Sequence, residues 1–511
     1  MELEELLAVM PECKILKGKI KTQINGLAYD SRCCEDGFIF FCKGKNFKSG
    51  YVLDALENGA TVFVSGREYI EVVYDVLKHT HITVILVDDI AAAMSQCASH
   101  FYGYPIKRLK TVAVTGTKGK TTVSHFISSI LNQCTDFKSA LLSDMIDDGV
   151  SHLTTPESID FQKAASKALD EGYTHLVCEI SSQAQKTGRV QGIEFDVSCF
   201  INLGNDHIGS GEHESVEEYF LCKAAIIKKS KVAVINVDWP YGVRLTKMIN
   251  KGQKIITVSE SGKEADYVCQ SIAADDKKCE ISVLDNIRKD VFVVSTTLLG
   301  THNAINMLCA CAVAVELGAG TKESYLGILG VHPSGRSKVL YSNDKRLCIV
   351  VDYAHNEMSL TAMSKMAKEQ LGAKTVTAVF GCPGDKAQCR RYGLALACQK
   401  NVDNVIICED DSGVEGYENI KKEMTVCFEK AKKAAALENK ELRVAYVENR
   451  AQALSTAIEN ALKNEGEVIL MLGKGEEALN RGAQGYAPCE SDLDIAKRMI
   501  LCYDSKDNKR I

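Results

Sequence analysis

The 511-residue sequence lacks several features that define special classes of protein. No CxxC pair occurs, which argues against a zinc ribbon, and only seven prolines are present, which argues against long proline-rich linkers. The longest apolar run, residues 307–315, is too short to cross a bilayer. The first ten residues, MELEELLAVM, include three glutamates and no basic residue. We therefore expect no secretory signal and a cytoplasmic location.

The net charge and the cysteine content indicate which partners and which state of the thiols to expect. The net charge is −6 at pH 7 and no long Lys/Arg block occurs, so we expect neither nucleic acid nor a membrane as a partner. The 21 cysteines are odd in number and irregularly spaced, which favours reduced thiols that act mainly as small buried hydrophobic residues. A chain of this length is expected to form about three domains. We expect it to be a monomer.

Apolar runs typical of strands alternate with segments of helical period, which predicts an α/β fold. We expect a small α/β domain at 1–108, a P-loop domain with a doubly wound, mostly parallel sheet and an appended β-meander at 109–334, and a Rossmann-like domain at 335–511. The expected strands are 37–44, 61–66, 82–89, 111–116, 175–181, 197–203, 232–238, 254–259, the meander within 267–299, 347–355, 375–381, 402–408 and 467–473. The tail 505–511 is expected to fray.

The most specific motif is TGTKGKTT at 115–122, between a predicted strand and a predicted helix. Strand, glycine loop and helix form the context of a phosphate-binding loop. Glycines let backbone N–H groups approach phosphate oxygens, Lys120 supplies positive charge, and Thr121 supplies a hydroxyl suited to Mg²⁺. Val114 stands where a strict GxxxxGK[ST] motif has glycine. A glycine-rich turn with an incidental lysine is the less favoured interpretation.

This loop resembles the nucleotide loop of the Mur ligase and folylpolyglutamate synthetase superfamily. Other segments resemble, in order, motifs of the MurE type, and their number and order carry the resemblance over nearly the whole chain. These segments are YDSR (29–32), TTPES (154–158), CEISSQAQKTGR (178–189), NLGNDH (202–207), EEYFLCKAAI (217–226), THNAIN (301–306), HPSGR (332–336), VVDYAH (350–355), GCPGDK (381–386) and LGKGEE (472–477).

The resemblance implies an ATP-dependent ligase that adds the third amino acid to UDP-N-acetylmuramoyl-L-Ala-D-Glu in peptidoglycan synthesis. ATP would phosphorylate the substrate carboxylate, and an amine would attack the acyl phosphate. The resemblance also implies that 1–108 binds the UDP substrate, 109–334 binds ATP and 335–511 binds the amino acid. The residues alone support metal-assisted phosphoryl transfer, in which cations stabilise the charge of the transition state.

The resemblance also implies two Mg²⁺ sites. Thr121 and Glu179 are assigned to one ion, and Glu179 and His207 to the other. Lys223 matches a lysine that is carbamylated by CO₂ and then supports the second Mg²⁺, which requires a desolvated, neutral amine. Without the resemblance, His207 would be interpreted as a satisfied polar residue and Lys223 as a solvated charge. The remaining catalytic cations are Lys120 and Arg336.

Other matches concern the substrates. Arg336, between the second and third domains, is expected to reach the phosphates after domain closure. Asn303 and Asn306 match the adenine-side motif, although Asn303 can equally cap its helix. The predicted ATP-binding residues are Gly116, Thr117, Lys118, Gly119, Lys120, Thr121, Thr122, Asn303, Asn306, Arg336, Asp352 and His355. The predicted UDP-substrate residues are Ser31, Arg32, Thr154, Thr155, Ser182 and Arg189, although TTP alone is equally a turn before a helix.

The sequence departs from the family motifs in several places. Gln183 and Glu476 each replace a histidine, and the segment 206–213 is about two residues longer than usual, which reshapes the loop near the second metal. Residues 410–413 read DDSG, whereas relatives that use meso-diaminopimelate have DNPR, whose arginine binds the distal carboxylate.

The amino acid therefore stays open between lysine and meso-diaminopimelate. Gly413 in place of arginine favours lysine or another cationic amino acid, unless Arg390 or Arg391 supplies the guanidinium. The predicted amino-acid residues are Asp410, Asp411, Glu415, Gly473 and Glu477. Two other functions remain open: a related ligase that acts on another carboxylate, and a nucleotide-binding paralogue without catalysis.

Overall fold

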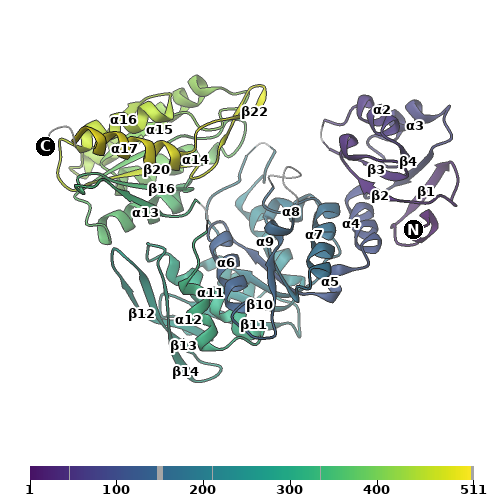
Figure 1. Ribbon diagram of the computed structural model, residues 1–511, viewed down its shortest axis with the longest axis horizontal. Helices are drawn as coiled ribbons and strands as arrows, with labels where there is room; N and C mark the ends of the chain where they lie inside the picture. The colour runs from purple at the N-terminus through teal and green to yellow at the C-terminus, as the bar shows by residue number, and fades with distance from the viewer. Residues whose placement is uncertain (45, 147–152, 210, 334, 508–511) are drawn as a thin grey trace. The chain divides into compact units, whose positions relative to one another are not determined.

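A computed structural model describes residues 1–44, 46–146, 153–209, 211–333 and 335–507, and Figure 1 traces its elements along the chain. The chain forms two compact units. Unit 1 comprises Met1–Thr115, Thr135–Ser198 and Ala225–Ala233, and unit 2 comprises Gly116–Cys134, Cys199–Ala224 and Val234–Ile511.

Unit 1 begins with a five-stranded sheet in the order β1-β5-β4-β3-β2, in which only β1 is antiparallel to its neighbour. Because successive strand residues face opposite sides, Ile39 and Phe41 pack towards α1 and α4, and Phe40 and Cys42 pack towards α2 and α3. The elements are α1 Leu3–Leu7, β1 Cys13–Lys17, β2 Gly26–Ala28, η1 Ser31–Cys33, β3 Phe38–Cys42, α2 Ser49–Glu57, β4 Ala60–Gly66, α3 Ile70–Leu77, β5 Thr83–Val87, α4 Ile90–Phe101 and α5 Pro105–Arg108.

The middle of the chain supplies nine strands in the order β14-β13-β12-β11-β10-β9-β6-β8-β7. The pairs β6–β8, β7–β8 and β11–β12 are parallel, whereas β12, β13 and β14 form the antiparallel meander. The elements are β6 Lys110–Thr115, α6 Lys120–Leu131, β7 Ser139–Leu141, η2 Leu142–Met145, α7 Ser158–Asp170, β8 His175–Glu179, α8 Ser182–Lys186, β9 Phe195–Phe200, α9 Val216–Lys228, β10 Ser230–Asn236, α10 Pro240–Thr246, β11 Lys254–Ser259, β12 Tyr267–Ala274, β13 Cys279–Asp285, β14 Asp290–Thr296, α11 Asn303–Glu316 and α12 Thr321–Leu329.

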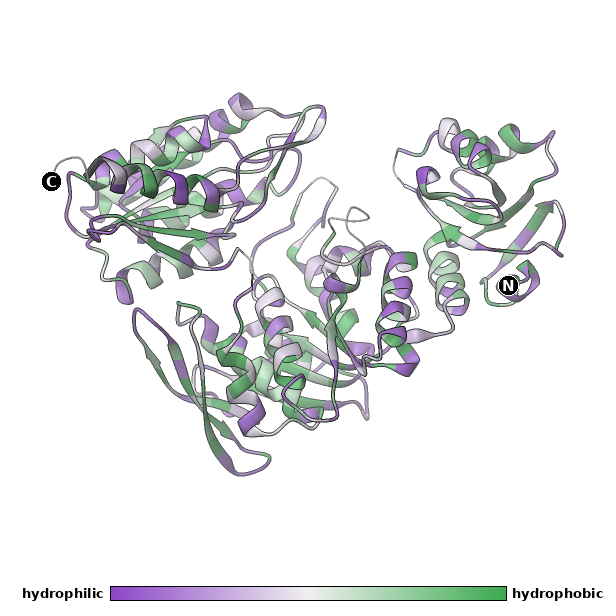
Figure 2. Cartoon of the chain, viewed as in Figure 1, coloured by the Kyte–Doolittle hydropathy of each residue, from purple (hydrophilic) through white to green (hydrophobic). Residues whose placement is uncertain are grey.

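Unit 2 also contains a six-stranded sheet in the order β15-β16-β20-β17-β18-β19, with β15 alone antiparallel. Helices α13, α14 and α15 cover one face, and α16 and α17 cover the other. The strands are largely hydrophobic and the helices are amphipathic (Figure 2). The elements are β15 Lys338–Tyr341, β16 Cys348–Asp352, α13 Glu357–Glu369, β17 Thr375–Phe380, α14 Cys389–Asn401, β18 Asn404–Ile407, α15 Tyr417–Leu437, β19 Arg443–Tyr446, α16 Arg450–Ala461, β20 Glu467–Leu472, β21 Leu479–Gly482, β22 Gly485–Pro488 and α17 Asp492–Asp507.

These three sheets confirm the predicted α/β fold, including the meander. The prediction missed short strands such as β15 and β19. It was wrong for 505–507, which belong to α17, while 508–511 lie outside the described residues. The 21 cysteines are free thiols, most of them buried. None of the helices in the described ranges is long and apolar enough to span a bilayer.

Candidate active site

The glycine loop, residues 116–119, leads into α6, which begins at Lys120. Gly119 has a φ of +87°, a left-handed conformation that favours glycine. A Cβ at this position would lie 2.4 Å from Oδ1 of Asn306, so the close approach also requires glycine. Nζ of Lys120 donates to the carbonyl oxygen of Gly116 at 3.0 Å. The loop thus has the tight backbone expected of a phosphate-binding loop, and the ammonium group of Lys120 lies against it.

Lys223 reaches the same loop from α9. Its side chain is fully buried, and its Nζ donates to the carbonyl oxygen of Gly116 at 2.9 Å. The ammonium also lies 4.5 Å from the ring centroid of Tyr219. Burial, reinforced by the charge of Lys120, lowers the pKa of Lys223 well below its usual value. Two lysines from different helices therefore converge on one carbonyl group.

Asn202 holds the other side of the glycine loop. Its Oδ1 accepts the backbone N–H groups of Thr117 and Lys118, both at 3.0 Å, and its Nδ2 donates to the Lys118 carbonyl at 3.1 Å. The hydroxyl of Thr117 lies 3.1 Å from the hydroxyl of Tyr219 and accepts the N–H of Gly204 at 2.9 Å. Thr117 therefore braces the loop from inside the protein, and its N–H is already bonded to Asn202.

A cavity of about 750 Å³ lies beside the glycine loop within unit 2. Asn303 and Asn306, at the start of α11, are buried in its wall, and Nδ2 of Asn306 donates to Oδ1 of Asn303 at 3.0 Å. Nδ2 of Asn303 donates to the Leu299 carbonyl at 2.9 Å, and its side chain makes no helix cap. Predicted ATP-binding residues that line the cavity are Lys118, Gly119, Thr122, Asn303, Asn306, Arg336 and Asp352.

Arg336 lines the cavity and also contacts the first turn of α6. Its Nη2 donates to Oγ1 of Thr121 at 3.4 Å, and its guanidinium lies 5.6 Å from the ring centroid of Tyr353. Asp352, at the end of β16, accepts the N–H of Ser337 at 2.8 Å and so fixes the backbone next to Arg336. Arg336 therefore already lies against a residue predicted to bind Mg²⁺.

A buried charge cluster that the sequence did not predict centres on Asp206. Its Oδ1 accepts from Nε of Arg390 at 2.6 Å, and its Oδ2 accepts from Nδ2 of Asn356 at 2.8 Å. Although burial opposes ionisation, Arg390 and the other cationic neighbours hold the pKa of Asp206 well below its usual value. The cluster ties the segment after β9 to α14 and to the start of α13.

Lys118 and His355 meet beside this cluster. Nζ of Lys118 lies 2.7 Å from Nε2 of His355 and 3.8 Å from Oδ2 of Asp206. Burial lowers the pKa of both Lys118 and His355 well below their usual values, and the charge of Lys118 further lowers the pKa of His355. The structure therefore brings together Lys118 and His355, two predicted ATP-binding residues, within hydrogen-bond distance in a buried environment.

His207 is held by the lengthened segment 206–213. Its Nδ1 lies 2.8 Å from Oε1 of Glu212, and its backbone has a φ of +57°. The other oxygen of Glu212 accepts the N–H of Ala387 at 2.9 Å. A carboxylate on one ring nitrogen orients the imidazole, an arrangement common around metal-binding histidines.

Unit 1 gathers part of the predicted UDP-substrate site. Arg189 donates from Nε to Oε1 of Glu157 at 3.1 Å and from Nη1 to the Thr155 carbonyl at 3.1 Å. Lys43 lies 2.5 Å from the other oxygen of Glu157. Oγ1 of Thr155 donates to the carbonyl of Glu179, the last residue of β8, at 2.8 Å. The sequence did not predict Lys43 or Glu157, which complete this network.

The other predicted residues of unit 1 lie apart from that network or at its edge. Arg32 is largely exposed and is paired with Asp30 at 2.5 Å. Ser31 is buried in η1 and Thr154 is exposed. Ser182 is buried at the first position of α8.

The predicted amino-acid residues surround the loop after β18. Asp411 is paired with Nζ of Lys474 at 2.9 Å. Asp410 is buried, and burial raises its pKa to about 6. Gly473 has a φ of +117°, and a Cβ there would lie 2.7 Å from Oδ2 of Asp410. Glu477 lies nearby, 4.0 Å from Nζ of Lys474. Only glycine at 473 leaves space for the buried carboxyl group.

Neither arginine considered as a substitute for Gly413 is available there, since Arg390 is paired with Asp206 and Arg391 with Glu415 at 2.7 Å. Arg481 of β21 instead lies against Gly413. A Cβ at Gly413 would lie 2.7 Å and 2.8 Å from the two terminal nitrogens of Arg481. The guanidinium is itself bonded to Asp385 at 3.0 Å.

Comparison with known families covers most of the chain. The Mur ligase middle domain matches residues 114–314, and the Mur ligase glutamate ligase domain matches residues 335–475. The chain belongs to the Mur ligase family. The predicted resemblance to the MurE type is confirmed, because relatives named UDP-N-acetylmuramyl-tripeptide synthetase match this chain along nearly their full length.

This Mur ligase is 33% identical to a UDP-N-acetylmuramyl-tripeptide synthetase of Ligilactobacillus salivarius, over 98% of this chain and 99% of the relative. It is 32% identical to a UDP-N-acetylmuramoyl-L-alanyl-D-glutamate–L-lysine ligase of Enterococcus faecalis, over 94% and 92%. The solved structure of a UDP-N-acetylmuramoyl-L-alanyl-D-glutamate–2,6-diaminopimelate ligase has the same fold, with a TM-score of 0.60, 22% identity and coverage of 98% and 99%.

Several residues that build the site of this Mur ligase escaped prediction. Asn202 and Asp206 both lie in the NLGNDH segment, in which only His207 was a predicted site residue. A signal existed, because that segment follows an apolar strand and contains three more polar side chains besides the histidine. Arg390 and Asn356 had no such signal, since their partner Asp206 lies more than about a hundred residues away in sequence.

Proposed function

We propose that this Mur ligase joins an amino acid to the free carboxylate of UDP-N-acetylmuramoyl-L-Ala-D-Glu with the use of ATP. The substrate carboxylate attacks the γ-phosphorus, giving an acyl phosphate and ADP. The amine of the amino acid then attacks the acyl carbon, giving an amide and phosphate. The name of the Enterococcus faecalis relative supports this acceptor and lysine as the amino acid, and the name of the Ligilactobacillus salivarius relative supports a tripeptide product.

The observation that carries the proposal is the convergence of Lys120 and Lys223 on the Gly116 carbonyl, with Arg336 against Thr121 nearby. Phosphoryl transfer needs little covalent chemistry from the protein, because positioned cations stabilise the charge on the phosphoryl oxygens. We assign this role to Lys120 and Arg336. Arg336 lines a cavity large enough for a nucleotide, and Lys120 follows Gly119 of the same lining.

We assign Mg²⁺ binding to Thr121, Glu179, His207 and carbamylated Lys223. Mg²⁺ prefers oxygen ligands, and when bound it would neutralise phosphate charge. The buried, deprotonation-prone amine of Lys223 fits the carbamate, because only a neutral amine attacks CO₂. That reaction forms an N–C bond, releases one proton and leaves an anionic carboxylate. Glu212 orients His207 through Nδ1.

We also propose a division of labour along the chain. Residues 1–108, with Ser31, Arg32 and the network around Arg189, bind the UDP-muramoyl substrate. Residues 109–334 bind ATP, and residues 335–511 bind the amino acid. The two family matches, which end at 314 and begin at 335, support a boundary between the second and third parts. A monomer in the cytoplasm suits these small-molecule substrates.

We propose a diamino acid as the third substrate, with lysine preferred. The loop after β18 supplies Asp410 and Asp411 for a cationic side chain, and the segment after β20 supplies Glu477. Arg390 and Arg391 are committed to carboxylates of the protein, and Arg481 is bonded to Asp385. A second carboxylate on the substrate would therefore have to displace an existing ion pair.

The test is ATP-dependent phosphate release with UDP-N-acetylmuramoyl-L-Ala-D-Glu and, in turn, L-lysine, meso-diaminopimelate, L-ornithine and neutral amino acids. We expect release with lysine and a product heavier by one lysyl residue. Lys120→Met should lower turnover by about a thousandfold or more, because it removes a cation from the phosphates. Lys422→Met, an exposed lysine on α15, is the matched control. Failure of every amino acid with protein that binds ATP would refute the proposal.

Carbamylation has a separate test. Lys223→Ala should lose most activity and regain part of it with formate, acetate or propionate, because these anions can occupy the space of a carbamate. Lys120→Ala should not respond to the same anions, since it lacks a cation. Full activity of Lys223→Ala without added anions would remove Lys223 from the site.

A further inference from the structure

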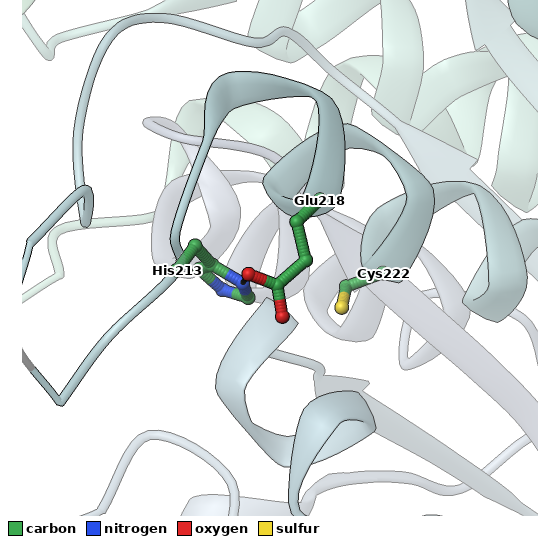
Figure 3. A group of neighbouring side chains, drawn as sticks. All are labelled: His213, Glu218 and Cys222. Atoms are coloured by element: carbon green, nitrogen blue, oxygen red, sulfur yellow. Dashed lines mark ion pairs between the residues drawn. The ribbon is translucent and has the colours of Figure 1, made fainter.

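His213, Glu218 and Cys222 form a cluster outside the residues assigned to the ligase reaction. Glu218 and Cys222 are four residues apart on α9 and so share one helix face, and His213 lies in the segment before this helix. One ligand atom from each side chain lies within 4.8 Å of the others. In Figure 3 the imidazole and the carboxylate point towards each other, with the thiol one helical turn further on.

We propose that these three side chains bind a zinc ion, with a water molecule as the fourth ligand. Thiolate and imidazole groups favour Zn²⁺ over Mg²⁺ or Ca²⁺. Cys, His and Glu are each zinc ligands, and zinc sites with three protein ligands keep a fourth position for water. In the described ranges this is the one group of three or more His, Cys, Asp or Glu residues with such spacing. The inference goes beyond the ligase reaction and does not depend on it.

The distances fit after small side-chain movements. Nδ1 of His213 lies 3.9 Å from Oε2 of Glu218. A tetrahedral zinc ion with bonds of about 2.0–2.3 Å separates its ligand atoms by roughly 3.3–3.8 Å. His213 is fully buried, whereas Glu218 and Cys222 are partly exposed, so the side chains of Glu218 and Cys222 can close the remaining gap. The same exposure gives an ion access from solvent.

Existing contacts orient two of the ligands. The ring of His213 packs against Tyr219 at a centroid distance of 5.1 Å, and Oε2 of Glu218 accepts the N–H of Glu214 at 2.7 Å. A carboxylate has lone pairs for more than one partner, so this hydrogen bond aims the carboxylate and leaves it able to bind a metal. Zinc would then fasten the segment that carries His213 to the first turns of α9.

The test uses the full-length protein, freed of bound metal by a chelator and kept in excess Mg²⁺ so that hard-ligand sites are occupied. Co²⁺ serves as the probe, because a cobalt ion bound to thiolate shows a sulfur-to-cobalt charge-transfer band. We expect this band, its loss on addition of one equivalent of Zn²⁺, and a rise in Tm with Zn²⁺.

Cys222→Ser should remove the charge-transfer band and weaken zinc binding by about tenfold or more. Cys427→Ser, which changes another half-buried helical thiol, should leave both unchanged. Glu218→Gln keeps an acceptor for the Glu214 N–H and should weaken zinc binding while the cobalt–thiolate band persists. Circular dichroism checks that each variant is folded. Zinc affinity that is equal in the wild type, Cys222→Ser and Glu218→Gln would overturn the proposal.

Discussion

Asp206 and Asp410 are both buried carboxyl groups of unit 2, but their neighbours differ. Asp206 has a direct ion pair with Arg390 and a hydrogen bond from Asn356, and its pKa is held well below the usual value. Asp410 has cations in its surroundings but no comparable direct bond, and burial raises its pKa to about 6. Burial alone therefore does not decide the ionisation of a carboxyl group in this protein. Direct contact with a cation does.

The difference separates two kinds of site. Near the glycine loop, Asp206 is an anion that holds α14 and the start of α13 through Arg390 and Asn356. After β18, Asp410 has a pKa of about 6, so its carboxyl group changes charge near that pH. Asp411 and Lys474, which are paired with each other, lie close to it. The first arrangement fixes geometry, and the second agrees with our proposal that this loop contacts a charged amino acid.

The largest effect is expected when Asp206 loses its cationic partner, Arg390. Arg390→Met should lower the free energy of unfolding by about 3–5 kcal/mol, because it leaves a buried carboxylate without its partner. Urea unfolding at neutral pH measures the loss. The double variant Asp206→Asn/Arg390→Met should lose clearly less, since no buried charge is then uncompensated. Equal losses for the single and double variants would contradict the role of the pair.

The same pair predicts an acid dependence. A carboxyl group whose folded pKa is depressed stabilises the fold above its unfolded pKa of about 3.9, and that stability disappears as the pH falls through the folded pKa. Unfolding measured from about pH 6 down to about pH 2 should show this loss in the wild type. Asp206→Asn should show a smaller acid-dependent loss.

Asp410 should behave with the opposite sign. Its folded pKa of about 6 exceeds its unfolded pKa of about 3.9, so its stabilising effect is present below about pH 4 and is lost as the pH rises to about 6. Asp410→Asn should abolish this decline and raise the free energy of unfolding at neutral pH by about 3 kcal/mol, because each pKa unit corresponds to about 1.4 kcal/mol. Asp411→Asn is the matched control, because Lys474 helps lower the pKa of Asp411 despite its burial, and the variant should be destabilised at neutral pH. Destabilisation of both variants to the same extent would contradict the assignment.

The features that could be predicted from the sequence are those encoded in consecutive residues. Long alternating segments such as 254–299 gave the strands and meander, because the burial pattern of a strand is written in consecutive residues. Lys120, Asn303 and Arg336 could be found because each lies in a short local motif. The structure places all three at one cavity or its edge.

What the sequence could not give is pairing between distant segments. Lys43 meets Glu157, and Arg390 meets Asp206, across more than about a hundred residues, and nothing local to either partner names the other. Gly413 illustrates the same limit, since the guanidinium that lies against it comes from β21. A substitution of arginine by glycine in a motif therefore did not mean that the neighbourhood lacks an arginine.

Arg481 gives the smallest expected effect. Its pair with Asp385 is partly exposed, and its other bonds include one to the Gly384 carbonyl at 2.6 Å. Arg481→Gln should therefore lower the free energy of unfolding by only about 1 kcal/mol, measured in urea. Arg443→Gln, which breaks the largely exposed pair with Glu441, should leave the free energy of unfolding nearly unchanged. A loss for Arg481→Gln as large as that of Arg390→Met would mean that this ion pair is as structural as the buried one. A small loss, with a raised KM for the amino acid and an unchanged KM for ATP, would instead place Arg481 among the groups that contact the incoming amino acid.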